Sequence, residues 1–233
     1  MIPMTAVTRA SLEAFVFDLL RAMGLPEEEA RIFGDALVFS ELRFHPGHGQ
    51  GVKKLRRYSG RFREGLVDVQ APFDVVKESP ALALVDAHNG IGTVMATRAM
   101  RLAIEKAKAC GVGQVVVRNS THFGSSAVHA CLGPEAGCIG IAMTNAGPEM
   151  ATCGGREGVV GTNPWGIAVP TGLGFPAVLD IALTTAGKGM MTWHAKEGRP
   201  IPLDWALTPE GEETDDPNAA MAGALLGIGQ YKG

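Results

Sequence analysis

Four groups of polar side chains in this sequence have the types and spacing to do chemistry. The first follows three consecutive valines, the second lies on a glycine-rich loop, the third is a Thr-Asn-Pro turn, and the fourth is an aspartate after an apolar run. Their residues are Ser120, Thr121 and His122; His45 and His48; Thr162, Asn163 and Pro164; and Asp180 after Leu179. A histidine moves protons near neutral pH, so these groups indicate general acid–base chemistry on a bound ligand.

Each group also has a simpler structural interpretation. A single histidine is more often structural than catalytic, and Thr-Asn-Pro is typical of a plain turn. Two histidines and one strand-end aspartate, each near glycines, favour a site, because an aspartate can fix the tautomer of a histidine and stabilise its charged form. The sequence alone leaves open which of these residues meet.

The elements that position these groups begin with helices. Apolar residues at helical spacing over 12–23 predict a first amphipathic helix, with Phe15 on its buried stripe. Gly24 is suited to end that helix and Pro26 to begin the next, whose buried face we expect to include Leu42.

A third predicted helix follows the glycine-rich loop and carries many cations. These are Lys53, Lys54, Arg56, Arg57 and Arg61. The simplest interpretation of so many charges on one short helix is a solvated face.

Beyond about residue 80, short apolar runs alternate with helical segments. The predicted strands lie at 81–86, 115–117, 137–143, 166–169 and 177–182, and the helices at 94–109 and 127–131. We expect the valine run at 115–117 to be a buried strand. The alternation predicts an α/β fold with an at least partly parallel sheet. A composition shift near 70–80 divides the chain into an N-terminal helical subdomain, residues 1–75, and an α/β domain, residues 76–233.

Composition limits the classes of protein to which the chain can belong. Its 233 residues are 46% hydrophobic and 19% charged, which is enough apolar surface for a sizeable core. The net charge of −3 and the lack of a basic patch with aromatic residues argue against nucleic acid as a partner. No apolar run is long enough to cross a bilayer and no signal peptide is evident, so we expect a cytoplasmic protein without membrane contact.

The cysteines and standard nucleotide motifs offer no further site. Cys110, Cys131, Cys138 and Cys153 make no CxxC pair, and no histidine spacing completes a zinc site. We therefore expect no metal and interpret the cysteines as small buried residues. No glycine-rich dinucleotide fingerprint follows a strand and opens a helix, so nucleotide binding cannot be argued from motifs.

Taken together, the polar segments resemble the malate/L-lactate dehydrogenase family that lacks the Rossmann fold and includes sulfolactate and ureidoglycolate dehydrogenases and 2,3-diketo-L-gulonate reductase. The most specific segments are RNSTHFG at Arg118–Gly124 and GTNP at Gly161–Pro164. Three further segments add to them, namely Leu179–Ala182, Thr214–Pro217 and Gly229–Gly233. Their order and spacing together carry the resemblance.

The resemblance implies hydride transfer, with NAD or NADP as cofactor, between a small 2-hydroxy acid and its 2-oxo acid, or reduction of a related imine. It implies a homodimer and a non-Rossmann mixed sheet flanked by helices. The catalytic residues would be His48 on the loop of the helical subdomain, Asp180 as its assistant, and His122, which matches the acid/base of some relatives. The implied cofactor contacts are Leu179, Asp180, Ile181, Thr184, Tyr231 and Lys232, and the implied substrate contacts are Ser120, Thr162 and Asn163.

Some positions depart from the family pattern. Gly47 replaces the serine that precedes the catalytic histidine, and an alignment made backwards from Val52 puts Gln50 in the histidine position instead of His48. Val128 and His129 replace an expected aromatic pair. Family members continue past Gly233, so we expect the chain to be truncated within its cofactor pocket. These departures keep an alternative open, a non-catalytic family member that binds a small acid or a partner.

Overall fold

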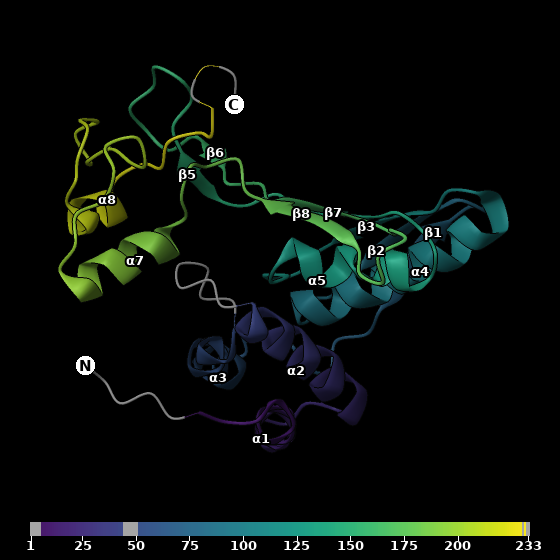
Figure 1. Cartoon of the computed structure of the whole chain (residues 1–233). Helices are drawn as coiled ribbons and strands as arrows, with labels where there is room; N and C mark the ends of the chain where they lie inside the picture. The colour runs from purple at the N-terminus through teal and green to yellow at the C-terminus, as the bar shows by residue number, and fades with distance from the viewer. Residues whose placement is uncertain (1–5, 44–50, 230, 232–233) are drawn as a thin grey trace.

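The computed structural model describes residues 6–43, 51–229 and 231, which form three regions (Figure 1). N-terminal helices lie on one side of a layer formed by α4 and α5, small sheets lie on its other side, and a lobe with α7 and α8 lies at the end of the sheets. The helices are α1 (Arg9–Ala22), α2 (Glu27–Leu42), the 3₁₀ helix η1 (Val52–Lys54), α3 (Leu55–Arg63), α4 (Gly92–Cys110), α5 (Ser126–Ala130), α6 (Leu132–Glu135), α7 (Lys188–Glu197) and α8 (Pro217–Ala222).

The N-terminal helices enclose an apolar core that they share with the start of α4. Gly24, with a φ of 91°, follows the end of α1, and Pro26 stands directly before α2, as the sequence predicts. The ring of Phe33 meets the ring of Tyr58 edge-on, with 4.8 Å between their centroids. The buried core residues include Val16, Leu20, Phe33, Leu37, Tyr58, Ile91 and Val94. The packing that closes this core therefore also holds Tyr58 in place.

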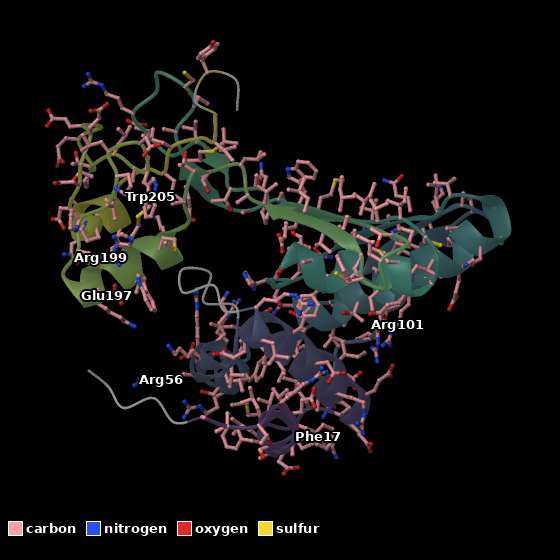
Figure 2. The ribbon with its side chains drawn as sticks, in the orientation of Figure 1. Phe17, Arg56, Arg101, Glu197, Arg199 and Trp205 are labelled. Carbon is pink, nitrogen blue, oxygen red and sulfur yellow. The ribbon has the colours of Figure 1, made fainter. Side chains whose placement is uncertain are left out.

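Two residues expected in this core lie outside it. Phe15 is 58% exposed and Leu42 is 51% exposed. The buried stripe of α1 runs through Val16, and Phe17 packs at its border with the guanidinium of Arg31 5.1 Å from its ring (Figure 2). Leu42 is the last residue of α2, where the helix has passed the core.

The strands form small sheets that combine parallel and antiparallel pairs. The strands are β1 (Asp74–Glu78), β2 (Leu82–Asp86), β3 (Gln114–Arg118), β4 (Gly140–Met143), β5 (Pro148–Met150), β6 (Val160–Gly161), β7 (Trp165–Val169) and β8 (Ala177–Ile181). The sheets have the orders β1-β2-β3, β4-β7-β8 and β5-β6. Strands β2 and β3 pair in parallel across the α4 crossover, and the other named pairs are antiparallel. The predicted mixed α/β class is confirmed.

Helices cover one face of the two larger sheets and leave the other face open. A Cβ added to Gly166 of β7 would lie 2.9 Å from the Cβ of Ser126, so α5 rests directly on that strand. On the opposite side Ile141, Met143 and Leu179 are 51%, 68% and 44% exposed. We call the exposed side chains Ile141, Met143, Val169 and Leu179 the open sheet face.

Strand β3 shows the same division between a covered and an uncovered side. Val115 and Val117 are half-buried beside α4, whereas Val116 is 52% exposed. The prediction of a buried strand at 115–117 is therefore wrong for one of its two faces. Three successive valines do not reveal which side lacks a helix.

The C-terminal lobe has a small core of its own. Its buried residues are Ala186, Met191, Ile201, Ala206, Ala220 and Leu225. Trp205 lies in this lobe (Figure 2). The ring of His194 lies edge-on to the ring of Trp205, with 5.2 Å between their centroids, and its Nδ1 lies 2.7 Å from the carbonyl oxygen of Pro200. His194 therefore contributes to the packing of this lobe.

The remaining expectations on organisation have mixed outcomes. Cys131 is buried, but Cys110 and Cys153 are exposed, which corrects the expectation of four buried cysteines. Strand β1 begins at Asp74, where the sequence places the change from helices to strands, and the division into domains 1–75 and 76–233 stays a prediction. Within the described ranges, no helix is both long and apolar enough to traverse a bilayer.

Candidate active site

The ends of β2 and β3 are fixed together by Asp86. Its carboxylate accepts hydrogen bonds from the backbone amide of His88 at 3.0 Å, from Asn119 Nδ2 at 2.9 Å and from Arg118 Nε at 2.9 Å. These bonds, the one from His88 foremost, lower the pKa of Asp86 to about 2. The first two residues of the RNSTHFG segment therefore bind the neighbouring strand.

The next part of that segment docks on the N-terminus of α4. The Thr121 hydroxyl donates to the carbonyl of Gly90 at 2.8 Å and accepts from the amide of Gly92 at 3.0 Å. A Cβ on Gly92 would overlap the backbone of Thr121 and His122, so the loop lies directly against a residue without a side chain. Thr121 also satisfies an amide that the first turn of a helix leaves without an internal partner.

This docking brings His122 against η1 and α3. Its Nε2 lies 3.3 Å from Nζ of Lys54, and its Nδ1 lies 3.3 Å from the hydroxyl of Tyr58. The amide of Gly124 donates to the same Nδ1 at 3.2 Å. Residues 68 and 64 positions apart in the chain thus form one polar cluster, which we call the Lys54–Tyr58–His122 cluster.

The surroundings of the cluster shift the pKa of each of its members. Loss of solvation, together with Arg57, lowers the pKa of Lys54 to about 8. Loss of solvation, followed by the positive charges of Lys54, Arg57 and Arg61, lowers the pKa of His122 to about 4, although part of this residue remains exposed. Loss of solvation raises the pKa of Tyr58 to about 12. The imidazole is therefore neutral near pH 7, and Lys54 titrates closest to neutrality.

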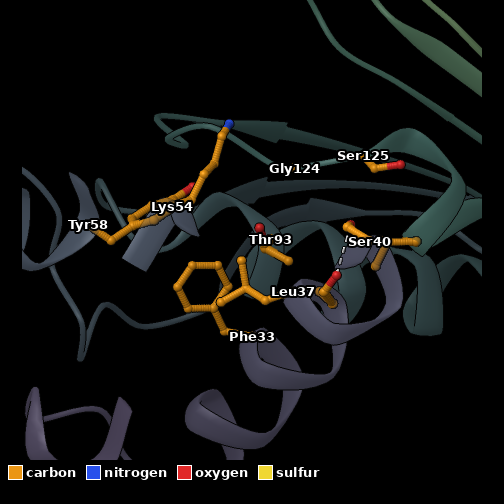
Figure 3. Close-up of a pocket in the computed structure, with 10 residues that line it drawn as sticks. Phe33, Leu37, Ser40, Lys54, Tyr58, Thr93, Gly124 and Ser125 are labelled. Atoms are coloured by element: carbon orange, nitrogen blue, oxygen red, sulfur yellow. Dashed lines mark hydrogen bonds between the residues drawn. The ribbon is translucent and has the colours of Figure 1, made fainter. Parts of the chain in front are cut away.

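A small pocket lies beside the cluster, between the N-terminal helices and α5. Lys54 and Tyr58 form one side of it and Ser125 lies on the other, above an apolar floor that includes Phe33 and Leu37 (Figure 3). Its remaining lining residues are Ala36, Ser40, Thr93, Gly124 and Val128. The pocket has an empty volume of about 240 Å³, less than most small-molecule sites, and combines an apolar floor with a few polar groups.

Asp180 belongs to β8, and its side chain binds the start of α5 and contacts Ser125 of the pocket. Its carboxylate accepts from the Ser125 hydroxyl at 2.5 Å and from the amide of Ala127 at 2.9 Å. Its negative charge also acts on buried His129, whose pKa is nevertheless lowered to about 4, chiefly by burial. In the described chain Asp180 therefore binds the helix that follows His122, and its expected action on a catalytic histidine stays a prediction.

A second group of predicted residues meets near the C-terminal lobe. The amide of Leu183 donates to the carbonyl of Thr162 at 2.8 Å, and Thr184 forms a β-bridge with Gly227. The side chain of Asn163 accepts the amide of Ala146 at 2.9 Å. The Thr184 hydroxyl is buried and has no hydrogen-bond partner among the described residues. The predicted cofactor stretch therefore adjoins the Thr-Asn-Pro turn and the terminal turn.

The remaining predicted site residues have different outcomes. His48 and Lys232 lie outside the described residues, so their expected roles stay predictions. Ser120 and Tyr231 are exposed, as is Leu179 on the open sheet face, and Ile181 is half-buried. The predicted substrate and cofactor roles of these residues stay proposals.

Sequence reasoning missed two members of the cluster. The sequence pattern places Lys54 on a solvated face with Lys53 and three arginines, and it indicates no site role for Tyr58. The structure keeps Lys53 exposed but places Lys54 against His122. The available signal was the helical spacing of four between Lys54 and Tyr58, which puts a cation and a hydroxyl on the face that also carries buried Leu55.

The structure is that of a mixed α/β protein with a cluster of titratable side chains between its N-terminal helices and the loop that follows β3. The model of the malate/L-lactate dehydrogenase family matches residues 7–233. The chain belongs to this family.

Individual relatives and solved structures agree with that membership. The chain is 38% identical over 226 residues to a malate dehydrogenase of Pyrococcus horikoshii, a match of 97% of this chain and 62% of the relative. It is 37% identical over 218 residues to an L-sulfolactate dehydrogenase of Methanocaldococcus jannaschii, a match of 94% of this chain and 62% of the relative. The structure of a malate dehydrogenase from Entamoeba histolytica superposes with a TM-score of 0.92 at 31% identity, and the match covers 98% of this chain and 66% of that one. The chain thus spans less than two thirds of the length of these curated relatives.

The docking of Thr121 on Gly92 generates a stability prediction. Gly92→Ala should lower the free energy of unfolding, because overpacking costs about 1–3 kcal/mol and the clashing atoms are backbone that cannot change rotamer. The gain in helix propensity, at most about 1 kcal/mol, is smaller. Urea denaturation measures the difference.

Gly60→Ala is the matched control for this substitution. Gly60 lies inside α3 and has open space where a Cβ would be, so the free energy of unfolding of this variant should rise by about 0.5–1 kcal/mol. A Gly92→Ala protein that is as stable as the Gly60→Ala protein would contradict the docking.

Proposed function

We propose that this protein transfers a hydride between NAD or NADP and a small 2-oxo acid or 2-hydroxy acid, or a related imine. The observation that carries the proposal is the Lys54–Tyr58–His122 cluster beside a pocket, in a chain of the malate/L-lactate dehydrogenase family. Reduction of a carbonyl to a hydroxyl requires a proton at the oxygen, and this cluster holds titratable groups beside the pocket.

The charges around the pocket favour an acidic substrate. Lys54, Arg57 and Arg61 all act on His122, and each lowers its pKa, so their positive charges converge at this point. A carboxylate that enters the pocket would be attracted by the same charges. This field supports a substrate with at least one carboxylate group.

The cofactor residues suggested by the sequence fit a polar ligand. The buried Thr184 hydroxyl has a free hydrogen-bonding capacity among the described residues, and a ribose or amide group could satisfy it. Leu179 and Ile181 of β8 offer apolar surface beside it. A nicotinamide bound there would supply or accept the hydride. With Asp180, Tyr231 and Lys232, these residues form the proposed cofactor contacts.

The sequence departures at 47–51 favour a second candidate, a family member that binds a small acid without turnover. Gly47 stands where the family has a serine, and Gln50 competes with His48 for the histidine position. Calorimetry with NADH and NADPH separates the two candidates, because binding of either cofactor is expected only for the oxidoreductase.

Turnover tests the proposed oxidoreductase. We expect oxidation of NADH or NADPH in the presence of a panel of 2-oxo acids and cyclic imine carboxylates, followed by absorbance. His122→Asn should lower kcat/KM roughly 10- to 100-fold, since it removes the ring that contacts Lys54 and Tyr58.

His88→Asn is the matched control for the turnover test. His88 is partly exposed, lies outside the cluster and has a φ of 45°, which asparagine tolerates. This variant should retain the wild-type rate. Equal rates for the His122→Asn and His88→Asn proteins would contradict the placement of the site.

We further propose that a second copy of the chain covers the open sheet face. Exposed Ile141 and Met143 of β4 lie on the same face of the sheet as exposed Leu179 of β8, with β7 between the two strands, and apolar surface of this kind marks interaction sites. A two-fold contact through one self-complementary face is the commonest way in which soluble proteins form dimers.

Sedimentation equilibrium tests this dimer. The wild-type protein should sediment as a dimer and Ile141→Asp as a monomer, because the substitution would bury an unpaired charge in the contact. Leu66→Asp, at a residue 51% exposed but remote from this face, should leave the dimer intact. A monomeric wild-type protein, or a dimer that survives Ile141→Asp, would contradict the proposal.

A further inference from the structure

Protein groups engage both ring nitrogens of His122. The amide of Gly124 can only donate, so the Nδ1 that it contacts at 3.2 Å acts as an acceptor and the proton of the neutral ring is on Nε2. That Nε2 lies 3.3 Å from Nζ of Lys54, which accepts the proton when its amine is neutral. The Nε2 proton of the imidazole is therefore directed to Lys54 and is not available to a ligand in the pocket.

The ring can also serve the charged form of Lys54. An ammonium group donates to Nε2 if the ring changes tautomer. The Nδ1 proton then points to the oxygen of Tyr58, 3.3 Å away, and the Gly124 amide loses its acceptor on Nδ1. The ring thus has a hydrogen-bonding arrangement for each protonation state of Lys54. Lys54 and Tyr58 line the pocket together with Gly124 and Ser125. His122, on the loop between β3 and α5, contacts Lys54 and Tyr58 but does not line the pocket.

Among the described residues, the charged and titratable groups around Lys54 belong to α2, to α3 and to the loop between β3 and α5. Arg57 and Tyr58 belong to α3, and His122 belongs to the loop between β3 and α5. On α2, the Glu41 carboxylate accepts the amide of Val52 in the same turn as Lys54, at 2.9 Å. Burial and Arg57 lower the pKa of Lys54 to about 8, nearer to neutrality than His122 at about 4 or Tyr58 at about 12.

We propose that Lys54 is the general acid and base of the proposed reaction and that His122 is its positioning residue. The assignment rests on the proposed function, with the reduced nicotinamide as the hydride donor. As the carbonyl carbon gains the hydride, the π electrons of the C=O bond move to the oxygen. A new O–H bond forms with a proton of Lys54, the Nζ–H bond breaks, and its electron pair remains on the neutral amine. Oxidation of the hydroxyl reverses each of these changes.

The proposal fixes the sign of the pH dependence. Reduction requires the ammonium form of Lys54, so its rate should fall as the pH rises through about 8. Oxidation requires the neutral amine, so its rate should rise over the same range. A reaction in which His122 donates the proton would instead lose its reductive rate on the acidic side of neutrality, near the lowered pKa of that ring.

Steady-state kinetics with three variants tests the assignment. Lys54→Met should lower kcat roughly 10²- to 10⁴-fold with a smaller change in KM, and primary amines added to the solution should restore part of the rate in proportion to their basicity. In the His122→Asn protein the reductive rate should still fall at alkaline pH, but at a different pH from the wild-type protein. Lys53→Met, at the exposed neighbouring lysine, should match the wild-type protein. A Lys54→Met protein within tenfold of the wild-type kcat would overturn the assignment.

A titration that needs no turnover separates this inference from the proposed function. In NMR spectra of the protein with labelled lysine and histidine, the Lys54 side chain should titrate near pH 8, and His122 should titrate below its ordinary value of 6.5. The signals that vanish in the Lys54→Met and His122→Asn spectra assign these groups. A Lys54 that titrates above pH 10 overturns the inference even in an active protein. A protein with the expected titration but no turnover contradicts the proposed function instead.

Discussion

The contact on which the candidate site depends is the docking of one loop against the first turn of α4. Gly92 has no side chain to keep the backbone of Thr121 and His122 away, and the Thr121 hydroxyl bonds on both sides of it, to Gly90 and Gly92. The Asp86 carboxylate holds the preceding residues of the loop to β2. Two ordinary structural devices, a missing Cβ and a buried carboxylate, therefore decide where His122 can lie.

The same docking explains the electrostatic character of the site. It presses an imidazole against a helix that carries Lys54, Arg57 and Arg61, where a positive ring is disfavoured by loss of solvation and by three like charges. His122 is thereby kept neutral, and Lys54 is left as the group that changes charge near neutral pH. A site that repels a second cation attracts a carboxylate, which connects the arrangement to the acids that we propose as substrates.

The sequence predicts helices α1 to α5 and strands β2, β3, β4, β7 and β8, because these depend on local spacing and on turn chemistry. It does not predict α6, α7 and α8 or the strands β1, β5 and β6. It placed the strand at 115–117 correctly but not its exposed face, since the position of α4 on one side depends on tertiary packing. It missed Lys54 because the spacing of four between Lys54 and Tyr58 does not show which of the five cations in this segment contacts a distant loop. It also does not show that Arg118 and Asn119 bind Asp86, because this carboxylate lies 32 and 33 residues away in the chain.

The most direct test of this account is the pKa of His122 in a Thr121→Val protein, measured by NMR titration of the imidazole. Valine keeps the shape of threonine but removes both hydrogen bonds that dock the loop on α4. If that docking holds the ring against Lys54 and Tyr58, its pKa should rise from its lowered value toward 6.5. A folded Thr121→Val protein in which the pKa of His122 is unchanged would contradict the account.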